Sequence, residues 1–199
     1  LMRVFTLREQ ERYYTILDDF ERGQADTLVK TESLSLLTMP KTLFAQILRR
    51  AGLDLAGKAP IHERRREIFL KNLRSNRFTE IISLPPFALI MSGGVKLSMS
   101  DMLGSGDVFY QQGEFVDHLQ QILALLESCE NYNVHLFDRP IEERYSVYAR
   151  EELGVIVANT SQPSVVLAIS EGNLTAAFWD FLKSLIGDTP YAAPLKAVS

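Results

Sequence analysis

The stretch that decides the fold is Asn133 to Gly187, NVHLFDRPIEERYSVYAREELGVIVANTSQPSVVLAISEGNLTAAFWDFLKSLIG. Its first segment, Asn133–Asp138, alternates polar and apolar side chains, which predicts a strand because successive side chains point to opposite faces of a sheet. Pro140 ends this strand, since proline has no N–H to donate to a neighbouring strand. Tyr145–Ala149 alternates in the same way and is the second predicted strand.

Two apolar runs follow, Val155–Ala158 and Ser164–Ile169, and residues 159–163 between them are turn formers. This arrangement predicts an antiparallel hairpin. Apolar runs without alternation are typical of strands that are buried on both faces, so we expect helices to cover the sheet.

A helix is predicted after the hairpin, with Asn173 as its N-terminal cap and Gly187 at its end. Large apolar residues recur along it at helical spacing: Leu174, Phe178, Phe181, Leu182 and Leu185. Burial of each is worth roughly 1.5–3 kcal/mol. We therefore expect this helix to pack on the hairpin and to share a single dry interior with it.

The same patterns, applied upstream, predict strands within 27–39 and over Phe78–Leu84, a short strand at Val95–Met99, and a loop at Leu53–Pro60. A capping box at Thr6 and Glu9 indicates where the first helix begins. The predicted helices are Thr6–Arg22, Lys41–Ala51, His62–Ser75 and 113–129. Residues Phe87–Tyr110 fit no pattern and are interpreted as a flexible insertion or a loop over a pocket.

The predicted fold class is α/β (α+β), with a mixed, largely antiparallel sheet and helices packed on it. We expect an N-terminal helix/strand/helix segment over residues 1–60, a sensor-like core over 61–187 and a loosely ordered tail over 188–199. These parts are expected to form one compact unit. Leu1 precedes Met2, which indicates an excised fragment with a segment missing upstream.

Composition excludes several classes of function. The chain has 199 residues, a net charge of −4 and one cysteine, Cys129, so a disulfide framework and a cysteine metal cluster are not expected. The negative charge argues against a nucleic-acid grip by this chain alone. No apolar run reaches the roughly 18 residues of a membrane span, and no signal segment is evident, so a cytoplasmic protein without membrane partners is predicted. No cofactor motif is found.

Candidate ligand-binding residues gather at predicted strand ends, where side chains often line pockets. They are His135, Asp138, Arg139, Tyr145 and Arg150. The alternative interpretation is a structural imidazole for His135 and surface ion pairs for the charged residues. His118 lies beside Asp117 on a helix and is predicted to be exposed. No catalytic or metal-binding residue is predicted, because no histidine has a partner at metal-ligand spacing.

The order of elements from Glu80 to Gly187 resembles that of a known family. Glu80–Pro85, Asn133–Asp138, the hairpin Gly154–Ile169 and the helix Leu174–Ile186 resemble the regulatory region of bacterial helix-turn-helix transcription regulators. The same order is similar to one half of a phospholipase-D-like fold. Enzymes of that fold depend on an HxKxxxxD motif with a nucleophilic histidine. Here His62, His118 and His135 all lack a lysine two places later, so no catalytic residue carries over.

The leading hypothesis is a non-catalytic domain of a cytoplasmic transcription regulator that senses an unknown small molecule or protein. Helices Lys41–Ala51 and His62–Ser75 are too far apart for a helix-turn-helix, so DNA would be bound only through a missing upstream domain. Homodimerisation is expected, because palindromic DNA sites favour two-fold proteins. The alternatives are a small enzyme with His135, Asp138, Arg139 or Arg150 in a sheet-edge pocket, and a protein–protein interaction module.

Overall fold

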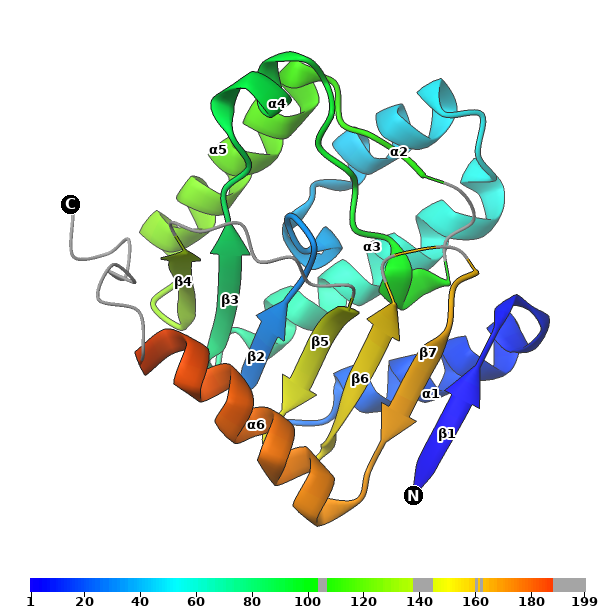
Figure 1. Ribbon diagram of the computed structural model, residues 1–199, viewed down its shortest axis with the longest axis vertical. Coiled ribbons are helices and arrows are strands. Elements are labelled where there is room, and N and C mark those ends of the chain that lie inside the picture. Colours follow the sequence, from blue (N-terminus) through cyan, green and yellow to red (C-terminus); the bar gives the residue numbers. More distant parts are fainter. Residues whose placement is uncertain (104–106, 138–144, 160, 162, 188–199) are drawn as a thin grey trace.

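A seven-stranded mixed sheet forms the centre of the computed structural model, which describes residues 1–103, 107–137, 145–159, 161 and 163–187 (Figure 1). The strand order is β1-β7-β6-β5-β2-β3-β4. Strand β2 pairs parallel with β3 and β3 with β4, whereas the other four pairs are antiparallel. The predicted fold class is therefore confirmed. The strands are β1 Met2–Phe5, β2 Thr27–Lys30, β3 Phe78–Ser83, β4 Tyr132–Phe137, β5 Tyr145–Arg150, β6 Gly154–Asn159 and β7 Val166–Ile169.

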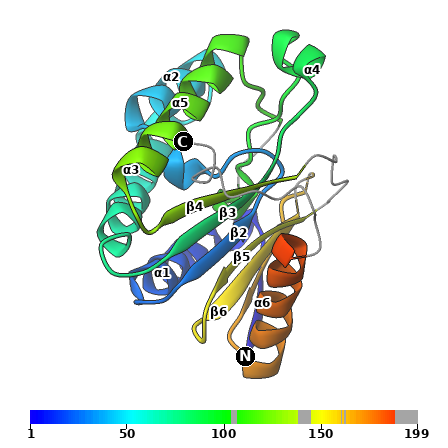
Figure 2. The ribbon, with the colours of Figure 1, turned by 90° about the vertical axis from the view of Figure 1, so that its left-hand side faces the viewer.

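Helices cover both faces of this sheet (Figure 2). One face, called the α1 face, carries α1, α3 and α5, and α2 packs on α3 and α5. The other, called the α6 face, carries α6, which contacts β2, β5 and β6. The helices are α1 Gln10–Arg22, α2 Lys41–Arg50, α3 Leu55–Asn72, α4 Phe87–Met91, α5 Gln112–Ser128 and α6 Gly172–Gly187.

The predicted hairpin is confirmed as β6 and β7, and its burial on both faces explains its continuous apolar sequence. Ile156 and Ala158 of β6 belong to the core of the α1 face. Val155 and Val157 alternate with them and belong to the core of the α6 face, together with Leu182. The hairpin and α6 therefore share a core on the α6 face, as expected, whereas the alternate side chains of the hairpin belong to a second core on the other face.

Helix α6 packs on the sheet through a stripe that differs from the predicted one. Leu182 is 0% exposed, and Phe178, Trp179, Leu185 and Ile186 pack around it. Leu174 and Phe181 were expected in this stripe but are 43% and 44% exposed. The helix is rotated so that positions 175, 178, 179, 182, 185 and 186, which are three or four residues apart, face the sheet.

Several predicted helix ends are also corrected. The carboxylate of Glu171, and not the side chain of Asn173, accepts hydrogen bonds at the start of α6, from the backbone N–H groups of Asn173 (3.2 Å) and Leu174 (2.8 Å). Thr6 makes no side-chain capping bond, and Leu7–Glu9 is a 3-10 turn before α1. A carboxylate or hydroxyl near a helix start identifies the start well, but the sequence does not show which side chain caps it.

The predicted loop Leu53–Pro60 is wrong, because α3 begins at Leu55 and contains Pro60. Asp54 caps this helix by accepting a hydrogen bond from the N–H of Gly57 (3.0 Å). The helix therefore forms in spite of the bond that Pro60 cannot donate. The strand predicted at Val95–Met99 is reduced to one bridge, Lys96 to Phe109.

Replacement of Leu182 by alanine should lower the free energy of unfolding by about 2–5 kcal/mol, because it leaves a cavity between α6 and the sheet. Its neighbour Phe181 is the matched control, since it is half-exposed and Phe181→Ala should cost about 1 kcal/mol or less. Urea denaturation followed by circular dichroism measures both. Equal losses in the two variants would contradict the rotation of α6 described above.

Candidate functional site

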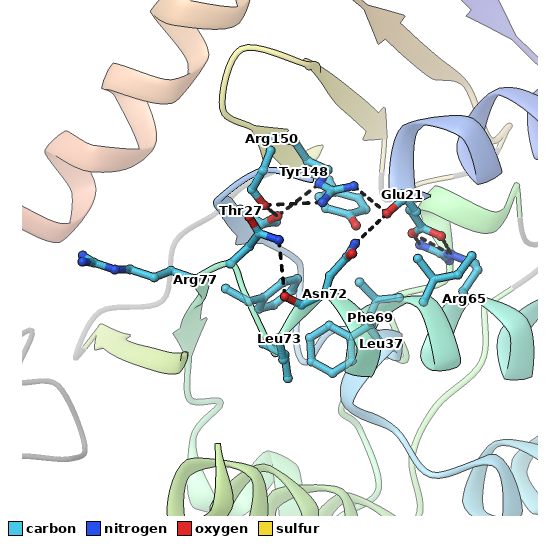
Figure 3. Close-up of a pocket in the computed structure, with 14 residues that line it drawn as sticks. Glu21, Thr27, Leu37, Arg65, Phe69, Asn72, Leu73, Arg77, Tyr148 and Arg150 are labelled. Carbon is cyan, nitrogen blue, oxygen red and sulfur yellow. Dashed lines mark hydrogen bonds and ion pairs between the residues drawn. The ribbon is translucent and has the colours of Figure 1, made fainter. Parts of the chain in front are cut away.

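Arg150, one of the predicted ligand-binding residues, is buried on the α1 face (Figure 3). Its side chain caps the C-terminal end of helix α1. Its guanidinium donates to the carbonyl oxygens of Phe20 (2.6 Å), Glu21 (2.7 Å) and Gly23 (2.7 Å). Longer contacts to the carbonyl of Ala25 and the hydroxyl of Thr27 engage its remaining donors. A guanidinium has five N–H donors, so its contacts with the fold account for all of them.

The pocket around Arg150 is too small for a metabolite. It measures about 10 Å³, which is room for one water molecule. On its far side, the buried Arg65 forms ion pairs with Glu21 and Asp101, both at 2.7 Å. Figure 3 shows Arg77 extending away from this pocket. The arrangement attaches α1 to α3 and β5 and leaves no space for a ligand.

The other described candidates, His135 and Tyr145, do not meet Arg150. Their positions in β4 and β5 place both side chains on the α6 face, whereas Arg150 lies on the α1 face. β2 and β3 lie between β4 and β5, so His135 and Tyr145 are about 14 Å apart across the sheet. Burial lowers the pKa of His135, and Tyr145 is exposed. Asp138 and Arg139 lie outside the described residues, as does the predicted tail 188–199.

A pocket of about 220 Å³ is lined by the segments that leave the carboxyl ends of β2 and β3. Ligands of α/β proteins often bind outside the carboxyl ends of the strands. Its polar lining residues are Glu32, Ser33, Ser83 and Lys96. Its apolar lining residues are Leu84, Pro85, Pro86, Leu89 and Val95. We call this cavity the β2–β3 pocket.

The polar lining contains groups that the fold does not satisfy. Ser33 is only 4% exposed, and the hydroxyls of Ser33 and Ser83 form no hydrogen bond of ordinary geometry with the described residues. The Ser33 hydroxyl is close enough to Tyr110 to lower the pKa of that phenol, which burial raises more strongly. A buried hydroxyl without a partner costs about 1–3 kcal/mol.

Charge in the pocket is nearly balanced. The Lys96 ammonium lies 2.9 Å from the carboxylate of Asp107 and 3.8 Å from that of Glu32. Burial raises the pKa of Glu32, and Lys96 opposes this shift. The Glu32 carboxylate is therefore the less compensated of the two acids.

A larger cavity of about 360 Å³ lies between α1 and the ends of β1, β6 and β7. Its lining is mostly apolar, with Arg3 and Asp19 as its charged residues among those described. None of the described buried polar atoms without a partner belongs to its lining. The β2–β3 pocket is therefore the better candidate for specific binding, which depends on a few placed polar groups.

A buried carboxyl group is hydrogen-bonded to the segment that follows β2. Glu80 of β3 is fully buried and accepts hydrogen bonds from the backbone N–H of Ser35 (2.6 Å) and the hydroxyl of Tyr132 (2.7 Å). Burial raises the pKa of Glu80 to about 7, and its hydrogen bonds from Ser35 and Tyr132 only partly oppose this shift. Its bond to Ser35 holds the segment that supplies Glu32 and Ser33 to the pocket.

His118, predicted to be exposed, is fully buried next to this network. Its Nε2 lies 2.8 Å from the hydroxyl of Thr38, and its Nδ1 lies 2.9 Å from that of Tyr110. Burial lowers its pKa to about 3, so the ring is neutral at pH 7. Sequence reasoning missed both this histidine and Glu80, although an acid within the apolar strand Phe78–Ser83 was a usable signal.

Comparison with known proteins adds information on the fold alone. No protein-family model and no curated protein matches the chain. NucT from Helicobacter pylori has a similar structure, with a TM-score of 0.50 and 11% identity over 98% of each chain. At 11% identity, this likeness concerns the fold alone.

A second solved structure is that of TrmBL2, an archaeal chromatin protein described as showing a novel mode of DNA binding. It has a TM-score of 0.48 and 8% identity, over 96% of this chain. The present chain spans 54% of that protein's length. No sequence family connects the chain to a regulator. In the described part, no helix is long and apolar enough to cross a membrane.

Replacement of Arg150 by lysine should lower the free energy of unfolding by about 2–4 kcal/mol, because one ammonium cannot reach the carbonyls that the planar guanidinium bonds. Arg77→Lys is the matched control, since Arg77 is exposed and should tolerate the change within about 0.5 kcal/mol. Chemical denaturation measures both variants. A fully stable Arg150→Lys protein would show that the guanidinium is not needed to end α1.

Replacement of Glu80 by glutamine should change how stability depends on pH. The folded-state pKa of about 7 lies above the ordinary value of 4.5, so the folded protein holds a proton that the unfolded chain has released. Stability from this group is present below pH 4.5 and is lost as the pH rises to 7, by roughly 3 kcal/mol. The glutamine side chain can still accept the hydrogen bond from the backbone N–H of Ser35, and it does not ionise.

The Glu80→Gln protein should therefore be more stable than the wild type at pH 8, and the difference should shrink toward pH 4.5. Thermal unfolding across this range measures the effect. Glu151→Gln, at an exposed turn, is the control and should leave the profile unchanged. A constant difference between Glu80→Gln and wild type at all pH values would contradict the raised pKa.

Proposed function

We propose that this chain is a non-catalytic, ligand-sensing domain of a transcription regulator, and that it binds a small molecule in the β2–β3 pocket. The observation that supports this proposal is the cavity of about 220 Å³ at the carboxyl ends of β2 and β3, which is lined by charged, hydroxyl and apolar side chains. DNA would be bound by a separate unit of the full-length protein. The sensing unit would then act by favouring one of two conformations.

The pocket is suited to this role because its walls come from two segments that follow different strands. Glu32 and Ser33 follow β2, whereas Leu84 to Lys96 follow β3 and include α4. A ligand that contacts both walls fixes one segment relative to the other. Leu89 of α4 lines the pocket, and on the same short helix Phe87 is 75% exposed. A ligand-dependent shift of α4 would thus be available to a neighbouring domain.

Two observations favour sensing over the alternative of a small enzyme. None of the three histidines has the lysine of the HxK motif two places later. In addition, His135, Tyr145 and Arg150 lie apart, with Arg150 fully engaged by backbone carbonyls. A general acid or base must lie within hydrogen-bond reach of the reacting group.

A thermal-shift screen with metabolites tests the pocket. At a concentration a hundredfold above Kd, a ligand of the folded state should raise Tm by about 5–10 °C. Ser83→Val removes one hydroxyl and narrows the pocket, so the shift should disappear in that variant. Thr79→Val is the matched control, because Thr79 lies on the same face of β3 at its other end, and this variant should keep the shift.

The same compound should change the Kd of the full-length protein for its DNA by about 5–150-fold, measured by fluorescence anisotropy. Failure of every compound to shift Tm, or a shift that survives in Ser83→Val, would rule out the β2–β3 pocket as the sensor site. A bound ligand without any effect on DNA affinity would rule out the regulatory role.

A further inference from the structure

We infer that the outer edge of β4 and the adjacent side of α5 form a two-fold interface with a second copy of this chain. Both elements lie on the side of the molecule that faces the viewer in Figure 2. None of the described residues that line the β2–β3 pocket belongs to β4 or α5, so this inference does not depend on the proposed function.

Strand β4 is the last strand of the sheet, and no strand among the described residues pairs with its outer edge. The backbone N–H of Phe78 in β3 donates to the carbonyl oxygen of Asn131 (2.8 Å), which fixes the alternation of backbone groups along β4. Residues 133 and 135 therefore bond toward β3, and the N–H and C=O groups of Val134 and Leu136 point outward. Such a row of outward groups is a template for another strand.

The two edges of the sheet differ in their protection against pairing. Proteins usually protect an edge strand by making it short or by placing charge or proline in it. At the other edge, β1 has four residues and carries the exposed Arg3. β4 has six residues and contains neither lysine nor proline, and burial lowers the pKa of His135, so that the strand is uncharged at pH 7. The edge at β4 is therefore the one suited to pairing.

Helix α5 adds an apolar stripe to this side of the molecule. Two of its members, Val116 and Leu123, are 41% and 50% exposed, and the other two are partly buried. Successive members are three, four and three residues apart, which is the spacing of the contact face in paired helices. We call them the α5 stripe, and they are Val116, Leu119, Leu123 and Leu126.

The α5 stripe lies beside the outer edge of β4. Glu114, on another side of the helix, pairs with Arg50 of α2 at 2.7 Å, so α2 does not cover the stripe. Ile122 and Leu125 lie between these two sides and enter the core of the α1 face, where α5 contacts β4. At about 100° of rotation per residue, the stripe follows next around the helix, past the last strand of the sheet.

Strand and stripe share one midpoint, which an interface between two identical copies requires. The turn of residues 129–131 joins α5 to β4, so positions on the two elements can be matched by their distance from it. His135, between the two outward-facing residues, lies about 10 Å along β4 from Tyr132. The same distance of about 10 Å back along α5 from Ser128 leads to Gln121, which is the middle of the α5 stripe. One two-fold axis can therefore pass through both midpoints.

This axis brings apolar and backbone groups of the two copies together. Val134 of one copy lies opposite Leu136 of the other, and the two sheets continue into each other as antiparallel strands. The two α5 helices pack antiparallel, with Leu119 of one copy facing Leu123 of the other. Neither β4 nor the α5 stripe carries a charge, so no like charges meet at the centre. A different protein would need no shared midpoint, whereas a second copy does.

Sedimentation equilibrium tests the association. The wild-type chain should form a dimer with a Kd in the micromolar range or tighter. Leu123→Lys places a charge against apolar residues of the second copy and should raise this Kd at least about a hundredfold. Leu123 is half-exposed, so the variant should keep the circular dichroism spectrum of the wild type. Leu174→Lys is the matched control, because Leu174 of α6 is 43% exposed and lies outside the interface.

Hydrogen exchange tests the pairing of β4. In the wild-type dimer, the amides of Val134 and Leu136 should exchange slowly, because each donates to the second copy. In Leu123→Lys at the same concentration they should exchange at least about tenfold faster. The amide of Asn133 bonds to β3 and should stay protected in both proteins, which shows that the sheet itself is intact.

A wild-type chain that stays monomeric at roughly 100 µM would overturn the inference. A dimer that Leu123→Lys leaves intact, or one whose Val134 and Leu136 amides exchange as fast as in a monomer, would overturn it too. Dissociation by Val4→Lys and not by Leu123→Lys would place the contact at β1 instead. Open-ended oligomers would show a head-to-tail contact in place of a two-fold one.

Discussion

The backbone pairing of β2 determines where the rest of the structure lies. This strand, Thr27–Lys30, pairs parallel with β3 on one side and antiparallel with β5 on the other. All four of its residues are buried. Because β2 and β3 run parallel, the chain leaving β2 and the chain leaving β3 emerge at the same edge and line the β2–β3 pocket. An antiparallel pair of strands would send these two segments to opposite edges.

Buried polar groups in this fold are of two kinds, and the difference separates structure from function. Arg150 has all five donors engaged with α1 and its surroundings, so it holds the fold together and has nothing left for a ligand. The buried hydroxyl of Ser83 has no hydrogen-bond partner among the described residues, and Glu80 has hydrogen bonds without a cation. These groups lower stability where they stand. Unsatisfied polar groups of this kind are expected where a protein binds something.

The elements that could be predicted from sequence are those whose signal is local. The hairpin β6–β7, strand β3 and the helix positions follow from periodicity, because burial repeats every two residues in a strand and every three or four in a helix. The rotation of α6 could not be predicted, since Phe181 and Leu182 are equally apolar and tertiary packing selects between them. The helical conformation of Pro60 depends on the Asp54 cap and on packing of α3, which local propensity does not capture.

The candidate site was the hardest part to predict, for a physical reason. Its polar lining joins residues 32, 33, 83 and 96, and only the sheet brings these positions together. A charged residue at a strand end, such as Arg150, has the same local sequence signal whether it binds a ligand or caps a helix. What distinguishes the two roles is whether the fold itself supplies partners, and partners are a property of tertiary structure. Glu80 illustrates this, because its environment raises its pKa to about 7 through burial, while its bond to Ser35 couples that charge to the pocket wall.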